Sequence, residues 1–175
     1  MTKGWRGLAA DMLTQAIEQA RCSRLPADGY GRSRRLREAY HARRWLLGAA
    51  APVPACRCCA ITGIDHDALI SRLRRMGVLD PLPDDLVVRL LALPLTLRHW
   101  RGEPETFVRL LGHRWPRSAG ARQMLLRELS VLARLVGPDG IRLQRYQTTK
   151  GKLRLRYHYD PPVRLLPHQK SPIGA

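Results

Sequence analysis

Basic side chains are the groups with the most chemistry to offer in this sequence. Its 175 residues include 31 Lys and Arg against 14 Asp and Glu, a formal net charge of +17. A guanidinium binds phosphate oxygens bidentately and each phosphate contact releases counterions, so an excess of this size predicts a polyanionic partner. We expect double-stranded DNA, with RNA or an anionic lipid surface as alternatives. With 45% apolar residues, the chain should fold rather than remain an extended tail.

Four cysteines form the other chemically distinctive group, and three of them fall within residues 56–59. This spacing is too tight for two Cys-x-x-Cys pairs, although Cys22 together with His41 or His66 could complete a ligand set. We therefore expect reduced thiols, no metal and no cofactor. The sequence contains no catalytic triad order, phosphate-cradling glycine loop, HExxH or paired carboxylates, so we expect no enzymatic activity.

The segment from residue 55 to residue 76 has the pattern of a helix-turn-helix. A short helix over Ala55–Thr62 should end at Gly63, where a glycine can adopt the left-handed conformation. A second helix over His66–Met76 should follow an N-cap at Asp65. In this motif a small residue lets the two helices approach each other, and Cys59 stands at that position. The pattern predicts that the second helix enters a DNA groove.

The second helix of this motif should present one face to the core and the other to DNA. Leu69 and Leu73, four residues apart, are expected to face inward. The next inward position holds Arg72, where an apolar residue is usual. Either the helix is rotated so that Leu73 takes this place, or the segment is a plain helical hairpin. The side chains expected in the groove are His66, Asp67, Ile70, Ser71, Arg74 and Arg75.

Residues 5 to 78 carry a resemblance to a known class of regulators. The run Ala42-Arg-Arg-Trp-Leu-Leu, followed by Cys59-Ala-Ile-Thr-Gly-Ile-Asp, is similar to the pattern of small helix-turn-helix proteins of prophages and of gene transfer agent regulators. The sequence departs from this pattern at Thr62, where Ala is usual, and at Ala55, where a large aromatic residue is usual. The resemblance implies a transcriptional regulator of phage-like genes in a bacterium.

Further helices are needed to position this motif. Apolar residues at three- and four-residue spacing predict an amphipathic helix over Trp5–Arg21. Residues 23–33, with a proline and two glycines, should form a loop. The basic run after it places Arg34 and Arg35 among the expected phosphate contacts, and a second helix is expected over Leu36–Leu47.

Residues 81–99 should link two folded blocks. Two prolines stiffen the start of this stretch, and a helix is expected from an N-cap at Asp84 to Leu93, before a further proline. This helix should pack the second block onto the first.

The second block, residues 100–160, has the pattern of a winged helix. A helix from Trp100 to about His113 should precede a long helix over Ala119–Val136, for which Ser118 is the N-cap. Strict alternation of apolar and basic residues after residue 140 then predicts a charged β-hairpin. The expected DNA contacts are Arg117, Ser118, Arg122, Gln123 and Arg127 from the long helix and Arg145, Lys150, Lys152, Arg154 and Arg156 from the hairpin.

This block also resembles a known module. The residues that carry the resemblance are Trp100-x-Gly with Thr106 and Phe107, Trp115-Pro116-x-Ser118, the leucines at 125, 129, 132 and 135, and Gly140-Ile141. They are similar to the winged helix at the C-terminal end of phage and plasmid primase or helicase proteins. That resemblance implies an accessory nucleic-acid binder.

Together these patterns predict a mainly α protein with a helix-turn-helix domain at 1–80, a linking helix at 81–99, a winged helix at 100–160 and an extended basic tail at 161–175. We expect a sequence-specific DNA-binding regulator in the cytoplasm, at the bacterial nucleoid, with no membrane segment. The alternatives are an adaptor that docks on RNA polymerase or a replication protein while holding DNA, and a nonspecific DNA or RNA binder. Monomer and dimer stay equally open.

Overall fold

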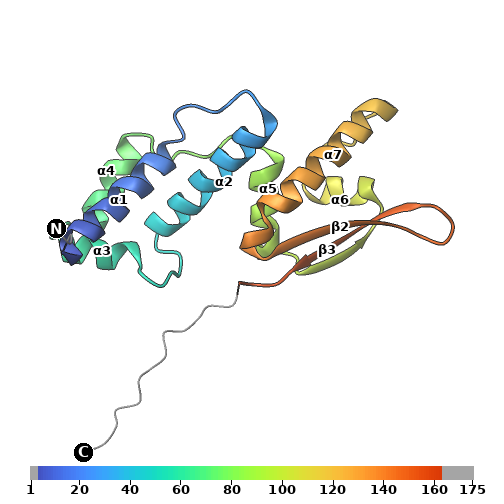
Figure 1. Cartoon of the computed structure of the whole chain (residues 1–175). Helices are drawn as coiled ribbons and strands as arrows, with labels where there is room; N and C mark the ends of the chain where they lie inside the picture. The colour runs from blue at the N-terminus through green and yellow to red at the C-terminus, as the bar shows by residue number, and fades with distance from the viewer. Residues whose placement is uncertain (1–3, 163–175) are drawn as a thin grey trace, which may run out of the picture.

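A computed structural model describes residues 4–162 of the chain, so most of the basic tail expected at 161–175 lies outside the described residues. The described part is mainly helical with one small antiparallel sheet, as the sequence predicted (Figure 1). Its α-helices are α1 (Trp5–Arg21), α2 (Gly29–Leu46), α3 (Ala55–Thr62), α4 (His66–Arg75), α5 (Leu86–Ala92), α6 (Pro104–Leu110) and α7 (Ala119–Leu135). Its strands are β1 (His99–Gly102), β2 (Ile141–Gln147) and β3 (Leu153–Tyr159), and two 3-10 turns are η1 (Leu93–Leu95) and η2 (Gly137–Asp139).

The first four helices form a bundle whose core is built largely from alanines. The buried face of α1 carries alanines at 9, 16 and 20, and that of α2 carries alanines at 39 and 42. Such small side chains let the helix backbones approach closely. Trp45, at the end of α2, donates an indole hydrogen bond to the Val53 carbonyl at 2.8 Å and so fastens the loop that leads to α3.

The expectation of a loop up to Ser33 was wrong, because α2 begins earlier, at Gly29. Asp28 caps this helix, and its carboxylate accepts a hydrogen bond from the Gly31 amide at 2.6 Å. An aspartate N-cap satisfies an amide that otherwise has no partner, which offsets the poor helix propensity of the two glycines. The basic run of residues 32–37 therefore lies on a helix.

The second unit consists of α5, α6 and α7 packed on one face of the sheet, whose strand order is β1-β3-β2. Both pairings are antiparallel, and Trp100 of β1 and Leu143 of β2 lie on either side of Tyr157 of β3. These residues alternate with charged ones, so the apolar face of the sheet packs against Phe107 and Leu129. The predicted hairpin and the N-cap at Ser118 are confirmed.

The expectation of a helix from Trp100 to His113 was wrong at its start, because the first of these residues form strand β1 instead. The helix α6 starts only at Pro104, whose fixed φ suits the first position of a helix. Trp100 still packs on Phe107, with ring centroids 5.1 Å apart. A further small correction concerns α5, which is capped by Asp85, while Asp84 is paired with Arg89.

The two units share a continuous core. Leu36 of α2 is fully buried in the same apolar cluster as α5 and α7. Two ion pairs close the junction at its edges, because Arg32 contacts Asp85 at 2.9 Å and Arg37 contacts Asp139 of η2 at 2.6 Å. The helix expected to link the blocks thus lies inside the second core and packs on α2.

Candidate nucleic-acid interface

The turn between α3 and α4 has the geometry that the sequence predicted. Gly63 has a φ of 79°, in the left-handed region, and the Ile64 amide donates back to the Cys59 carbonyl at 2.9 Å. Asp65 then caps α4 by accepting a hydrogen bond from the Ala68 amide at 2.6 Å. Cys59 is fully buried and packs in a cluster with Leu69. A small side chain therefore stands at the point where the two helices meet.

The orientation of α4 corrects the set of residues expected in the groove. Ile70, which was expected to contact DNA, is 8% exposed and belongs to the core of the bundle. Leu73 is also buried, while Arg72 is exposed. The helix is therefore oriented with Leu73 in the inward place. Arg72 joins the outward face, a functional candidate that the sequence reasoning missed by assigning it to the core.

The expectation that His66 contacts DNA also needs correction, because its ring contacts a backbone carbonyl within the protein. Its Nε2 lies 2.9 Å from the Leu46 carbonyl oxygen, and the side chain is 25% exposed. The imidazole thus attaches the first turn of α4 to the end of α2. The outward face of α4 consists of Asp67, Ser71, Arg72, Arg74 and Arg75. Within residues 4–162, no ion pair is formed by Arg72, Arg74 or Arg75.

Arg34 and Arg35 are paired with a carboxylate on the same helix, and Arg34 is exposed while Arg35 is half-buried. Both lie within 4 Å of the Glu38 carboxylate, at 3.5 Å and 3.7 Å respectively. Arg35 also donates to the carbonyl of Glu18 on α1 at 3.2 Å. The carboxylate partly neutralises both guanidiniums, so they are weaker phosphate ligands than the outward arginines of α4.

The first half of α7 is exposed and basic, as expected. Ser118 caps the helix, and its hydroxyl accepts a hydrogen bond from the Ala121 amide at 3.2 Å. Arg122 donates to the Pro116 carbonyl at 2.8 Å and stacks over the Trp115 ring at 5.8 Å from its centroid. These contacts hold the guanidinium beside the turn into α7. The other exposed candidates near this end are Arg117, Gln123 and Arg127.

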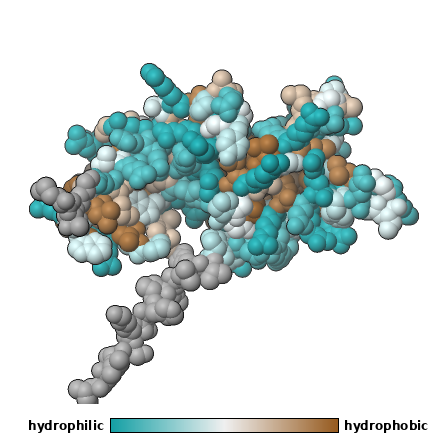
Figure 2. Space-filling model, viewed as in Figure 1, coloured by the Kyte–Doolittle hydropathy of each residue, from teal (hydrophilic) through white to brown (hydrophobic). Residues whose placement is uncertain are grey.

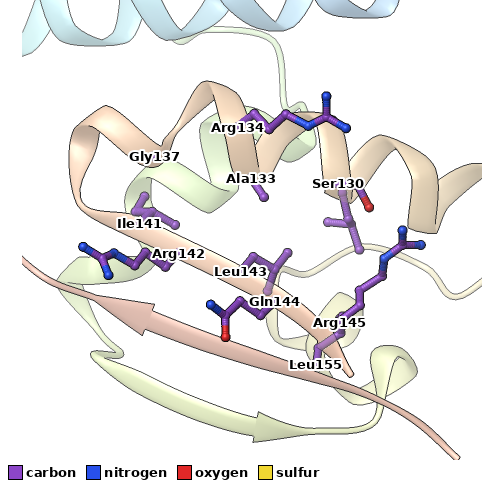
Figure 3. A pocket seen from close by; sticks show the side chains of 11 residues that line it. Ser130, Ala133, Arg134, Gly137, Ile141, Arg142, Leu143, Gln144, Arg145 and Leu155 are labelled. Carbon is purple, nitrogen blue, oxygen red and sulfur yellow. The ribbon is translucent and has the colours of Figure 1, made fainter. Parts of the chain in front are cut away.

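The basic residues expected to act together on the hairpin lie on different faces. Arg145 extends toward α7 and, with Arg134 and Ser130, lines a groove of about 490 Å³ between α7 and β2 (Figure 3). Arg154 and Arg156 alternate with the buried Leu155 and so point to the opposite face of the sheet. Arg154 also contacts the Glu103 carboxylate at 2.9 Å.

Lys150 and Lys152 lie at the exposed turn between β2 and β3. The Thr148 amide donates to the carbonyl of Lys152 at 2.9 Å, which closes this turn. Both ammonium groups are in solvent and within the described residues have no ion-pair partner. They extend the positive surface beyond the end of the groove.

The cysteines divide into exposed and buried thiols. Cys56 is exposed, whereas Cys58 and Cys59 are fully buried, and burial raises the pKa of both. Buried thiols of this kind stay protonated and behave as small apolar side chains. Across residues 4–162, no cluster of three or more His, Cys, Asp or Glu side chains is arranged to hold a metal ion.

The chain matches no known family model, curated protein or solved structure. In the described part of the chain, every helix is too short or too polar to cross a lipid bilayer.

Proposed function

We propose that the protein binds double-stranded DNA through two helical units and regulates transcription of phage-like genes. The observation that carries this proposal is the outward face of α4. Its basic side chains, Arg72, Arg74 and Arg75, share a surface with Ser71 and with a single carboxylate, Asp67. The tight turn at Gly63 fixes this helix against α3. A short polar, basic helix supported in this way is the size and shape that fits a major groove.

The second unit supports the same proposal through its order of elements. The order of elements α5–β1–α6–α7–β2–β3, with strand order β1-β3-β2, is compatible with the winged-helix arrangement that we propose for this unit. In that arrangement α7 is the groove-reading helix, and the hairpin turn lies against the sugar-phosphate backbone. The outward face of α7 has one large apolar side chain with high exposure, Met124, among residues 119–135. This composition favours DNA over a protein partner for α7.

The proposed contacts separate into two kinds. Ser71 and Arg75 are four residues apart on α4 and so lie on one face, where they would read base edges. Lys150 and Lys152, on the hairpin turn, would contact phosphates and add affinity for any sequence. Specificity should therefore depend on α4, and Lys150 and Lys152 should contribute to the salt dependence of binding.

Selection of sites from a random duplex library with the full-length protein tests this proposal. We then expect Arg75→Ala to weaken binding to the selected site about tenfold with little effect on scrambled duplex. Lys150→Ala should weaken binding to both duplexes alike and lower the slope of log K against log salt by about one. Arg21→Ala, at an exposed position on α1, is the control.

Two results would contradict the proposal. A library that yields no enriched site would point to the nonspecific alternative. Equal losses on selected and scrambled duplex for Arg75→Ala would show that α4 does not read sequence. Occupancy of the tagged protein on the host genome then distinguishes a regulator, with peaks upstream of phage-like genes, from an adaptor, with peaks that follow RNA polymerase.

A further inference from the structure

The sheet of the second unit has an outer face on which, in residues 4–162, no helix packs. Alternation along the strands places Trp100, Leu143 and Tyr157 on the inner face, against the helices, and their neighbours on the outer face. Figure 3 shows Leu143 and Arg145 directed toward α7, with Gln144 on the other side of β2. We define the outer sheet face by Arg101, Arg142, Gln144, Tyr146, Arg154 and Arg156.

The outer sheet face is strongly basic. It carries four arginines from three strands, and the register places Arg156 directly between Arg101 and Gln144. Two carboxylates lie at its margins, where Glu103 pairs with Arg154 at 2.9 Å and Asp160 contacts His158 at 2.6 Å. Within the described residues, Arg101, Arg142 and Arg156 have no carboxylate partner, so this face keeps a net positive charge at its centre.

Tyr146 organises two of these arginines. The guanidinium carbon of Arg101 lies 5.1 Å from the centre of the Tyr146 ring, and that of Arg156 lies 5.6 Å from it. Arg101 also donates a hydrogen bond from its Nε to the Tyr146 hydroxyl. Cation–π contacts of this kind hold long side chains in place and reduce the entropy lost when they bind an anion.

A shallow hollow of about 550 Å³ lies on this face, bounded by Arg101, Arg142 and Arg156 and by the stacked rings of His99 and His158, whose centroids are 4.4 Å apart. A duplex phosphate backbone suits it better than a single strand. Single-strand binders need open aromatic rings on which bases stack, whereas two guanidiniums cover Tyr146 and the histidines cover each other.

We propose that the outer sheet face binds the phosphate backbone of a second DNA duplex. Because α7 packs on the inner face of the sheet, a duplex held along α7 leaves the outer face free. One molecule can then bridge two duplexes, one read by α4 and α7 and one held without regard to sequence. This inference rests on the proposed DNA-binding function and adds a second, opposite surface to it.

A sequential loading assay tests the bridging. The full-length protein is bound to a bead-linked duplex that carries the selected site, washed, and then offered a fluorescent duplex of unrelated sequence. We compare the wild type with Arg101→Gln/Arg142→Gln/Arg156→Gln. The matched control removes three other exposed arginines, in Arg21→Gln/Arg24→Gln/Arg44→Gln. Each variant loses three positive charges, so any effect of net charge alone is common to both.

We expect the outer-face variant to load onto the first duplex as well as the control does and to retain about tenfold less of the second duplex. Arg142→Gln alone should reduce retention about threefold, and because Arg142 forms no ion pair among the described residues, this change leaves the fold intact. Retention of the second duplex by the triple variant equal to that of the control would overturn the proposal. The same result is expected if a dimer of the protein bridges the two duplexes through other surfaces.

The remaining outcomes separate the two proposals. Failure of the wild type to load onto the first duplex would overturn the proposed function itself. Loading without retention of the second duplex would overturn only the bridging. Displacement of the second duplex by a single-stranded oligonucleotide at lower concentration than by unlabelled duplex would assign the outer sheet face to single strands instead.

Discussion

The ion pair between Arg37 and Asp139 gives a direct test of how the two units are joined. Asp139 accepts a hydrogen bond from Arg37 Nε at 2.6 Å, and His41 Nε2 lies 2.8 Å from its other oxygen. The carboxylate is 17% exposed and the guanidinium 24%. Burial opposes ionisation of Asp139, but the hydrogen bonds and charges of His41 and Arg37 outweigh it and lower its pKa.

Asp139→Asn should therefore lower the free energy of unfolding by about 2 kcal/mol. This value lies between the ~0.2–1 kcal/mol of an exposed ion pair and the ~3–5 kcal/mol lost when one partner of a buried pair is removed. For a chain of this length it corresponds to a fall in Tm of roughly 4–8 °C. Because the units share a core through Leu36, we expect a single unfolding transition in urea for both proteins. Asp67→Asn, at a fully exposed position, should change stability by no more than about 0.5 kcal/mol.

The pH dependence has a defined sign. The pKa of Asp139 is lower in the folded protein than in the unfolded chain, so its contribution is complete above about pH 4 and is lost as the pH falls through the folded value. The difference in stability between wild type and Asp139→Asn should therefore shrink as the pH falls below 4. A difference that stays the same at pH 3, or a loss at pH 7 no larger than that of Asp67→Asn, would refute this account of the junction.

Further substitutions test the local geometry of both helical units. Gly63→Ala should destabilise the protein by about 1 kcal/mol in thermal unfolding, because its φ of 79° strains any side chain, whereas Gly120→Ala should stabilise it by up to about 1 kcal/mol. Equal effects would show that the turn does not need a left-handed residue. Ile70→Ala should cost about 3 kcal/mol in urea unfolding as a core truncation, while Arg72→Ala should leave stability within about 0.5 kcal/mol and weaken DNA binding. A larger loss of stability for Arg72→Ala than for Ile70→Ala would show that Ile70 is not part of the core.

Local signals in the sequence were sufficient for much of the fold. The turn at Gly63, the caps at Asp65 and Ser118 and the alternating hairpin each depend on residues within a few positions of one another. Strand β1 could not be found in this way, because its four residues acquire a strand partner only from β3, more than fifty residues later. The expected helix there also had a local reason, since Pro104 does begin a helix just beyond the strand.

The candidate site was less predictable, because it depends on the rotation of α4. A shift of the helix by one residue exchanges an outward position with an inward one, and the choice between Arg72 and Leu73 needed the packing of the whole bundle. The bond between His66 and the Leu46 carbonyl joins residues twenty positions apart, and nothing in the local pattern announces it. Alternation along the strands places the hairpin arginines on two faces of the sheet, and this could be predicted from the sequence. Which of the two faces is exposed could not be predicted, because it depends on which face the helices cover.

The shared core has a consequence for how DNA would be read. If α4 and α7 were joined by a flexible linker, each helix would bind its own segment of DNA. Binding of the first helix would then only raise the effective concentration of the second helix near the DNA. Leu36 instead packs with α5 and α7, and the pairs Arg32–Asp85 and Arg37–Asp139 fasten both edges of the junction. The two proposed groove-reading helices are thus parts of one body, so a duplex that fits both loses orientational freedom only once. Specificity can then reside in the separation of two short base patterns as much as in either pattern alone.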